Sequence, residues 1–144
     1  MAKLNTSGLL VYKDNDFKPF EIDETKRYVM CGVPGAFTPG CTEKHLPGYV
    51  KSLDQFYAKG IDQIVFMGVN DPCVMDAWNK IYGHEDIIAV SDAEAEFTKR
   101  MGFDHDYGAG MGVRCRRFAI LIENGEMKKE LHIPFAQGAL GEVY

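Results

Sequence analysis

The chain has 144 residues, a length that fits one domain. Apolar residues make up 46% and charged residues 26%, the balance of a globular protein rather than of a disordered chain. The net charge of -5 argues against broad binding to nucleic acid or anionic membranes, because clustered Lys and Arg bind such surfaces. No apolar run approaches the roughly 20 residues of a membrane span.

Four cysteines stand at positions 31, 41, 73 and 115. No two of them form a Cys-x-x-Cys pair, which argues against a zinc knuckle and against a thioredoxin-type dithiol. Residues 1–8 contain no apolar signal segment, and the chain is long enough to build a core without disulfides. We therefore expect free thiols in a reducing compartment, the cytoplasm.

In the first half of the chain, predicted strands alternate with predicted helices. The expected elements are a hairpin of Leu9–Tyr12 and Phe17–Ile22 across Lys13–Asp16, a buried strand at Arg27–Val33, a helix at Cys41–Ala58 closed by Gly60, a second buried strand at Ile61–Val69, and a helix at Pro72–Tyr82. Pro47-Gly48 falls inside the first helix and is expected to kink it. Asp71 is a good N-cap for the second helix, with Pro72 in its first turn.

The second half of the chain continues the pattern and closes with a hairpin. The expected elements are a strand at Ile87–Val90, a helix capped by Ser91–Glu94 that runs to about Met101, an irregular glycine-rich stretch at Gly102–Gly112, a strand at Arg116–Ile122, and its antiparallel partner at Met127–Ile133. Asn124-Gly125 forms the hairpin turn between the last two strands.

This order of elements predicts an α/β fold. Buried strands that alternate with helices imply a central β-sheet flanked by helices on both faces. The closing hairpin adds an antiparallel edge, so the sheet is mixed. The layout is that of a thioredoxin-like fold with N-terminal and C-terminal hairpins. Residues 1–144 contain no internal repeat or long linker, so we expect a single domain.

Cys41 is the cysteine with a functional position. Reactive groups in α/β sheets collect at the carboxyl ends of strands, where loops lead into helices. With Thr38 as N-cap and Pro39 as the first helical residue, Cys41 falls in the first turn. Free N–H groups and the positive end of the helix dipole favour the thiolate there. The alternative is a small buried apolar residue, which most free cysteines are.

Arg117 favours the reactive role. Cys115, Arg117, Ala119 and Leu121 share one face of the strand predicted here, and the other face is apolar too. An arginine near the middle of such a buried strand needs an anion, because burying an unpaired charge is prohibitive. A carboxylate and a cysteine thiolate are the two candidate partners. Beside a thiolate, its N–H groups would also bind an oxygen-bearing substrate.

Three stretches resemble one known family. Pro34-Gly-Ala-Phe-Thr-Pro-Gly-Cys41 matches the Pro-x-x-x-Thr-x-x-Cys signature of peroxiredoxins. The longer run from Gly32 to Gly48, together with Val69–Trp78 and Arg114–Phe118, is similar to the type II group, which contains the fifth mammalian peroxiredoxin and its plant relatives. The resemblance covers roughly residues 9 to 133. It implies a thioredoxin-like fold and a thiol peroxidase that requires no metal or organic cofactor.

The resemblance also implies a role for each matching residue. Cys41 would be the peroxidatic cysteine, whose thiolate attacks the O–O bond and becomes a sulfenic acid. Thr38 would place its hydroxyl against the thiolate and the peroxide, and Arg117 would stabilise the thiolate and the charge on the leaving oxygen. Pro34 would shield the site from water.

Neighbouring residues have less specific expectations. His45 follows Cys41 by one helical turn, and it either tunes the site or is a structural or solvated histidine. The remaining expectations are core positions for Trp78 and Phe118, a turn and a helix cap for Asn70 and Asp71, and paired surface charge rather than a basic patch for Arg114 and Arg116.

The chain departs from its relatives in its other cysteines. Neither familiar resolving position holds one: none follows Cys115, and Phe66 stands where plant-type members often have a cysteine. Cys31, Cys73 and Cys115 are the remaining candidates. We expect a one-cysteine mechanism, in which glutathione with glutaredoxin, or thioredoxin, reduces the sulfenic acid.

The C-terminus departs as well. Residues 134–144 are expected to be too few for the final helix of the family, which predicts an apolar face in need of cover. Because type II peroxiredoxins pair near the active site, we expect a homodimer. A peroxide sensor or redox relay, which passes oxidation from Cys41 to a partner protein, is the alternative function and would use the same residues.

Overall fold

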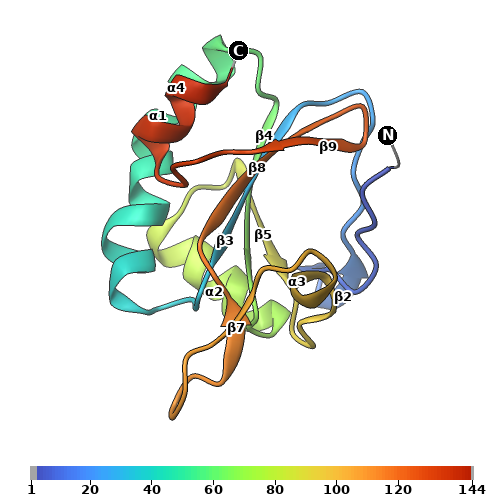
Figure 1. The fold of residues 1–144 in the computed structure, drawn as a ribbon, viewed down its shortest axis with the longest axis vertical. Helices are drawn as coiled ribbons and strands as arrows, with labels where there is room; N and C mark the ends of the chain where they lie inside the picture. Colours follow the sequence, from blue (N-terminus) through green and yellow to red (C-terminus); the bar gives the residue numbers. More distant parts are fainter. Residues whose placement is uncertain (1–2, 144) are drawn as a thin grey trace.

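The computed structural model describes residues 3–143 and holds a seven-stranded mixed sheet with a two-stranded ribbon beside it (Figure 1). The sheet, in spatial order, consists of β2 (Asp16–Pro19), β1 (Leu10–Lys13), β5 (Ile87–Ser91), β4 (Gln63–Gly68), β3 (Tyr28–Val33), β8 (Phe118–Glu123) and β9 (Glu126–Glu130). The ribbon pairs β6 (Asp104–Asp106) with β7 (Val113–Cys115). The helices are η1 (Cys41–His45), α1 (Leu46–Ala58), α2 (Pro72–Tyr82), α3 (Glu96–Arg100) and α4 (Ala136–Glu142). None of these helices is long and apolar enough to cross a membrane.

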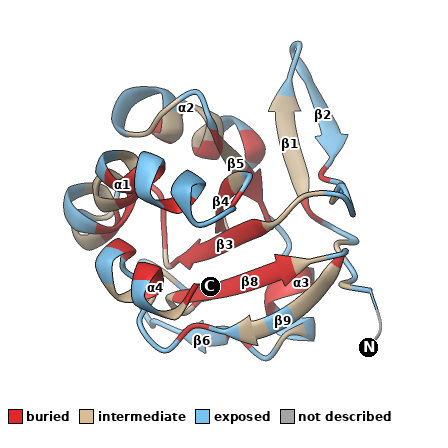
Figure 2. Ribbon diagram, turned by 90° about the horizontal axis from the view of Figure 1, so that it is seen from above, coloured by how far each residue is buried: buried red, intermediate tan, exposed pale blue. Residues whose placement is uncertain are grey.

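Two apolar clusters cover the two faces of the sheet. On one face, side chains of β3 and β4 pack against α1, α2 and α4, with Tyr49, Phe56 and Trp78 fully buried. On the other face, Phe97 of α3 and Phe118 of β8 belong to the second cluster. Figure 2 shows the result, with burial concentrated in the central strands β3 and β8. The predicted α/β fold with a mixed sheet between helices is confirmed.

The sheet topology brings three loops to one edge. Strands β3, β4 and β5 are parallel, so their carboxyl ends lie at the same edge. Strand β8 runs antiparallel to β3, with Gly32 opposite Phe118, so β8 begins where β3 ends. The loop before Cys41, the loop before α2 and the residues before β8 therefore meet.

Both predicted hairpins are confirmed. Asp14 and Asn15 have φ of 54° and 59°, and Asn124 and Gly125 have φ of 54° and 75°. Positive φ at both central residues is the conformation of the type I′ turn, whose twist matches paired strands. The second strand of the last hairpin ends at Glu130, earlier than predicted, and residues 131–135 leave it toward α4.

The sequence predicts a kinked α-helix at Cys41–Ala58. The structure shows instead a helix that changes its hydrogen-bond pattern within this range. Residues 41–45 form the π-turn η1, and α1 begins at Leu46, whose N–H donates to the carbonyl of Cys41. Pro47 has no N–H to bond to Glu43 four residues back, which explains the irregularity. The irregularity therefore begins at Cys41, the candidate nucleophile.

The third helix begins later than predicted. Ser91 ends β5, and α3 covers only Glu96–Arg100. The buried Asp92 carboxylate accepts hydrogen bonds from the N–H groups of Phe97 and Thr98 and from the Thr98 hydroxyl. Asp92 belongs to the predicted cap stretch Ser91–Glu94 and does accept N–H groups of the first helical turn. It does so across a wider loop than a simple cap, so the helix begins only at Glu96.

The predicted strand at Arg116–Ile122 was wrong at its start, and the irregular stretch before it was wrong in part. Residues 104–106 pair with residues 113–115, and Arg116 and Arg117 lie between β7 and β8. The Arg116 N–H donates to the carbonyl of Phe103 at 2.7 Å instead of joining the sheet. Because Arg116 and Arg117 lie outside both strands, their side chains need not point to opposite faces of a sheet as successive strand residues do.

The expectation that the chain ends without a final helix was wrong. Helix α4 packs on α1 and buries Ala136, Ala139 and Leu140. The Lys59 ammonium donates to the carbonyls of Leu140 and Val143 at the end of the helix. A helix this short is stable only through such tertiary contacts, and it covers the face that we expected to be open.

Candidate active site

Cys41 lies at the start of a helix, as predicted. Residues 34–40 lead from the end of β3 into η1, and Pro39 and Gly40 already have helical backbone. The N–H of Thr42 makes the first intrahelical hydrogen bond, to the carbonyl of Thr38 at 3.0 Å, so the N–H groups of Gly40 and Cys41 lie ahead of it. The Cys41 side chain is fully buried. Helix geometry thus places dipoles that favour a negative charge around a thiol shielded from solvent.

Arg117 lies beside the backbone that leads into Cys41. A β-carbon on Gly40 would stand 2.6 Å from Nη2 of Arg117, so the guanidinium lies against a position where only glycine fits without a shift. Arg117 is partly buried and lies directly before β8, whereas the sequence predicted it near the middle of a strand. Cys115, predicted on the same strand face, belongs to the separate strand β7.

The guanidinium of Arg117 has no carboxylate partner among residues 3–143. None of the ion pairs within residues 3–143 involves it. Instead, its Nη1 donates to Nδ1 of His45 at 3.0 Å, and its central carbon lies 5.4 Å from the ring centroid of Phe135. Both contacts leave its positive charge uncompensated, so the arginine remains able to stabilise an anion.

His45 is a structural part of this site. It is fully buried, and its ring packs against that of Phe66, with the two centroids 5.1 Å apart. Nε2 donates to the carbonyl of Pro134 at 3.1 Å, because a carbonyl only accepts, and this leaves Nδ1 free to accept from Arg117. Burial, followed by the charge of Arg117, lowers the pKa of His45 to about 4. The imidazole is therefore neutral at pH 7 and anchors Arg117 as an acceptor, a role that only its contacts reveal.

The sequence predicts Thr38 as the N-cap, but its side chain does not cap the helix. Its hydroxyl donates to the carbonyl of Gly35 at 2.6 Å, and only its backbone carbonyl caps the first turn. A hydroxyl has a single proton, so Thr38 offers lone pairs rather than a hydrogen to a ligand. Pro34, which directly follows β3, is partly buried in the same loop.

Asn70 holds the loop in place, a role that the sequence did not indicate. Its Oδ1 accepts the N–H of Ala36 at 2.9 Å, which ties the loop after β4 to the loop before Cys41. Asp71 caps α2 as predicted, accepting the N–H of Val74 at 3.0 Å. The conformation that Asn70 supports includes Phe37 in the left-handed region, with φ of 64°.

The other cysteines have different surroundings. Cys31 in β3 and Cys115 in β7 are buried, and burial raises the pKa of each thiol to about 12. Asp92 also raises the pKa of Cys115, whose thiol donates to the carbonyl of Val33 at 3.0 Å. Cys73 is exposed in the first turn of α2. Of the four cysteines, only Cys41 combines a helix start with the neighbouring guanidinium of Arg117.

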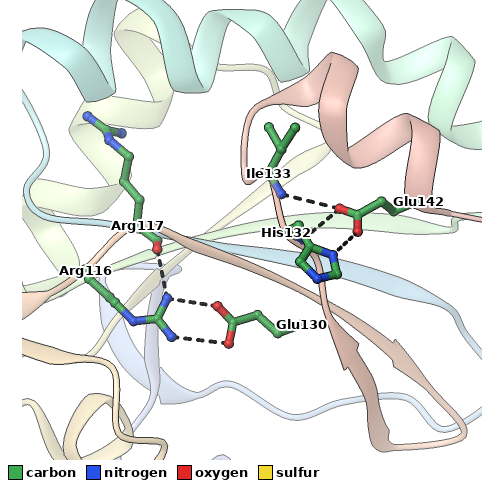
Figure 3. Close-up of polar contacts among 6 residues, drawn as sticks. All are labelled: Arg116, Arg117, Glu130, His132, Ile133 and Glu142. Atoms are coloured by element: carbon green, nitrogen blue, oxygen red, sulfur yellow. Dashed lines mark hydrogen bonds and ion pairs between the residues drawn. The ribbon is translucent and has the colours of Figure 1, made fainter.

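Arg116 has paired surface charge, as predicted. It binds Glu130 through two nitrogens, at 2.9 and 3.2 Å, and lies 4.6 Å from the ring centroid of Phe103. Figure 3 shows the Arg117 guanidinium pointing away from this pair. Trp78 and Phe118 are buried core residues, also as predicted, and Trp78 donates to the Thr42 hydroxyl at 3.0 Å.

Together these features define a thioredoxin-like protein in which Cys41 stands at a helix start, beside an arginine that pairs with no carboxylate in the described part of the chain. The Redoxin family model matches residues 5–135, and the chain belongs to this family as a peroxiredoxin.

The sequence comparison and the structure comparison both find peroxiredoxins. The chain is 43% identical over 107 residues to peroxiredoxin-2E of Arabidopsis thaliana, a match that covers 72% of this chain and 46% of that protein. Its structure is similar to reduced Prx3 from Vibrio vulnificus in complex with H2O2, with a TM-score of 0.92, 32% identity and coverage of 99% and 97% of the two chains. Peroxiredoxin 5 from Alvinella pompejana matches with a TM-score of 0.86 and 26% identity, over 99% of this chain and 95% of that chain. The chain thus spans about half the length of the plant relative and nearly all of the two solved structures.

Proposed function

We propose that this chain is a thiol peroxidase that reduces hydrogen peroxide and small alkyl hydroperoxides. The observation that carries the proposal is the Arg117 guanidinium, held beside the Cys41 helix start by neutral His45 and unpaired with any carboxylate of residues 3–143. Such a cation favours a thiolate and stabilises charge that develops on a peroxide oxygen. The likeness to a peroxiredoxin solved with H2O2 supports the same substrate class.

In the proposed reaction, Cys41 is the peroxidatic residue. Its thiolate attacks the terminal oxygen of R–O–O–H, so an S–O bond forms and the O–O bond breaks. Sulfur loses two electrons and becomes the sulfenic acid Cys–S–OH, and the peroxide gains them. The leaving RO⁻ takes a proton from solvent and departs as the alcohol, or as water when R is hydrogen.

The neighbouring residues position the peroxide in this proposal. Arg117 donates N–H groups to both peroxide oxygens and offsets the negative charge on the leaving one. The Thr38 hydroxyl, whose proton is engaged by Gly35, accepts the O–H of the peroxide through a lone pair. Pro34 excludes bulk water from the loop side of the site, which strengthens these interactions.

We propose a one-cysteine cycle for the return step. Cys31 and Cys115 are poor partners, because their buried thiols have pKa values near 12 and stay protonated. An external thiol, from glutathione with glutaredoxin or from thioredoxin, reduces the sulfenic acid. Because Cys41 is fully buried, the helix start must open before that thiol reaches the sulfur.

Steady-state turnover tests the proposal. Peroxide consumption is measured with glutathione and glutaredoxin, and separately with thioredoxin and its reductase, for the wild type, Cys41→Ser and the control Cys73→Ser. Cys41→Ser is expected to abolish turnover, while Cys73→Ser keeps it within about twofold, since only the thiolate is nucleophilic. Activity of Cys41→Ser within tenfold of the wild type would contradict the assignment.

Two further outcomes of this experiment separate the finer alternatives. Oxidation that stops after one equivalent of peroxide with both reductants would favour the sensor or relay. Mass spectrometry after one equivalent is expected to find a sulfenic acid on Cys41. A disulfide between Cys41 and any other cysteine of the chain would overturn the one-cysteine cycle.

We also propose that the chain forms a homodimer that packs beside the active site. Phe37 of the active-site loop is 47% exposed, and its ring meets that of the exposed Tyr82 edge to face, with centroids 6.1 Å apart. Exposed aromatic rings of this kind are typical of interface cores. Sedimentation velocity of the wild type and of Phe37→Ser tests the proposal, and a monomeric wild type at micromolar concentration would refute it.

A further inference from the structure

The segment that joins β9 to α4, residues 131–135, borders the arginine of the candidate site. The carbonyl of Pro134 accepts hydrogen bonds from Nε2 of His45 at 3.1 Å and from the Tyr49 hydroxyl at 2.6 Å. Because the other nitrogen of His45 holds Arg117, this carbonyl is two hydrogen bonds away from the guanidinium. The C-terminal segment is therefore part of the arginine's surroundings.

Helix α4 fixes the same segment from its other side. The Glu142 carboxylate accepts the N–H of His132 at 2.7 Å, the N–H of Ile133 at 3.4 Å, and a hydrogen bond from the His132 ring at 2.6 Å (Figure 3). These bonds lower the pKa of Glu142, so it remains ionised around neutral pH. The backbone that presents Phe135 is thus held between α1 and α4 and is not a free loop.

Phe135 places a large ring on the arginine. The central carbon of Arg117 lies 5.4 Å from the ring centroid, and the His45 ring lies 4.9 Å away, centroid to centroid. Phe135 is nevertheless 38% exposed, so part of the ring faces solvent next to the guanidinium. An exposed aromatic ring beside convergent polar groups is a typical feature of a ligand site.

We propose that Phe135 is a specificity-determining residue that binds the organic group of alkyl hydroperoxides. The inference rests on the peroxidase function proposed above. When Arg117 holds the two oxygens of R–O–O–H, the group R must project from the guanidinium, where Phe135 provides an apolar surface. Burying R against the ring lowers the free energy of the bound organic peroxide. Hydrogen peroxide has no such group and gains nothing from the ring.

The test compares two peroxides on the same protein, so that general damage to the site cancels. Reduced wild type and Phe135→Ala are mixed with cumene hydroperoxide or hydrogen peroxide in single-turnover experiments, and the second-order rate constant of Cys41 oxidation is measured for each. Phe17→Ala, which removes an exposed ring of β2 that packs on Tyr12, is the matched control.

In Phe135→Ala, the ratio of the cumene hydroperoxide rate constant to the hydrogen peroxide rate constant is expected to fall at least about fivefold. Phe135→Leu, which stays apolar, is expected to keep most of the ratio, and Phe17→Ala all of it. Equal losses for both peroxides in Phe135→Ala would overturn the inference, since the ring would then only support Arg117. A rise in the ratio would overturn it as well. A wild type that oxidises with neither peroxide would instead refute the peroxidase function itself.

Discussion

His45 makes the stability of the protein dependent on pH in a way that one substitution can isolate. The folded state lowers the pKa of His45 from 6.5 to about 4, mainly through burial and then through Arg117. Between these two values, the unfolded chain binds a proton that the folded chain does not. The free energy of unfolding therefore falls as the pH decreases from about 7 to 4.

The size of this effect follows from the two pKa values. At pH 5, the protonation of His45 favours the unfolded state by a factor of about 30, which corresponds to about 2 kcal/mol. Below pH 4 the full effect is about 3 kcal/mol. At pH 7.5 it is close to zero. His45→Phe removes the titrating group but keeps a ring between Phe66 and Phe135.

Urea unfolding at pH 7.5 and at pH 5.0, followed by far-ultraviolet circular dichroism at constant ionic strength, measures the effect. The stability of the wild type relative to His45→Phe is expected to decrease by about 2 kcal/mol between the two pH values. His105→Phe, which removes an exposed histidine, is the control for losing an imidazole. A difference between wild type and His45→Phe that stays constant with pH would refute the assignment of His45 as a buried neutral acceptor.

Two other substitutions test the surroundings of Arg117. Gly40→Ala places a methyl group 2.6 Å from Nη2 of Arg117 and is expected to slow Cys41 oxidation by about 10- to 100-fold. Gly40 has helical backbone, and the atom that must move is the end of the Arg117 side chain, so the free energy of unfolding is expected to change by less than about 1 kcal/mol, and urea unfolding shows whether the rate loss comes from a damaged fold. Gly141→Ala in α4, where a β-carbon meets nothing, is the control, and an unchanged rate in Gly40→Ala would contradict the close approach of the guanidinium. Arg116→Met removes the ion pair with Glu130, in which the Arg116 side chain is 41% exposed and the Glu130 side chain 40% exposed. This change is expected to lower the free energy of unfolding by less than about 1 kcal/mol and to leave the rate of peroxide reduction nearly unchanged. A large rate loss in Arg116→Met would show that the two arginines act together.

The arginine illustrates how partners decide a residue's role. A carboxylate partner would have compensated the positive charge of Arg117 in an ion pair and made the residue structural. Its actual acceptor is an imidazole that burial keeps neutral, so the guanidinium is oriented without being neutralised. The same acceptor depends on Pro134, which sets which ring nitrogen carries the hydrogen.

Sequence alone determined those features that depend on local chemistry. Alternating and continuous apolar runs predicted the central strands, Asp71 and Pro72 predicted the start of α2, and Asn124-Gly125 predicted a turn. The Pro34–Cys41 motif placed the cysteine at a helix start, because the loop and cap residues are adjacent in the chain. Each of these signals comes from neighbours within a few residues, where backbone preferences act directly.

Only the tertiary structure decided how the site is assembled. His45 and Arg117 are 72 residues apart, and Pro134 is 89 residues from His45, so no local pattern could join them. The break before β8 and the short helix α4 likewise depend on distant partners, the carbonyl of Phe103 and the ammonium of Lys59. Length, composition and four unpaired cysteines raised the question of a reactive thiol. The packing of the C-terminal segment on α1 determined which groups hold the arginine beside it, because hydrogen bonds among buried groups form only where the fold brings them together.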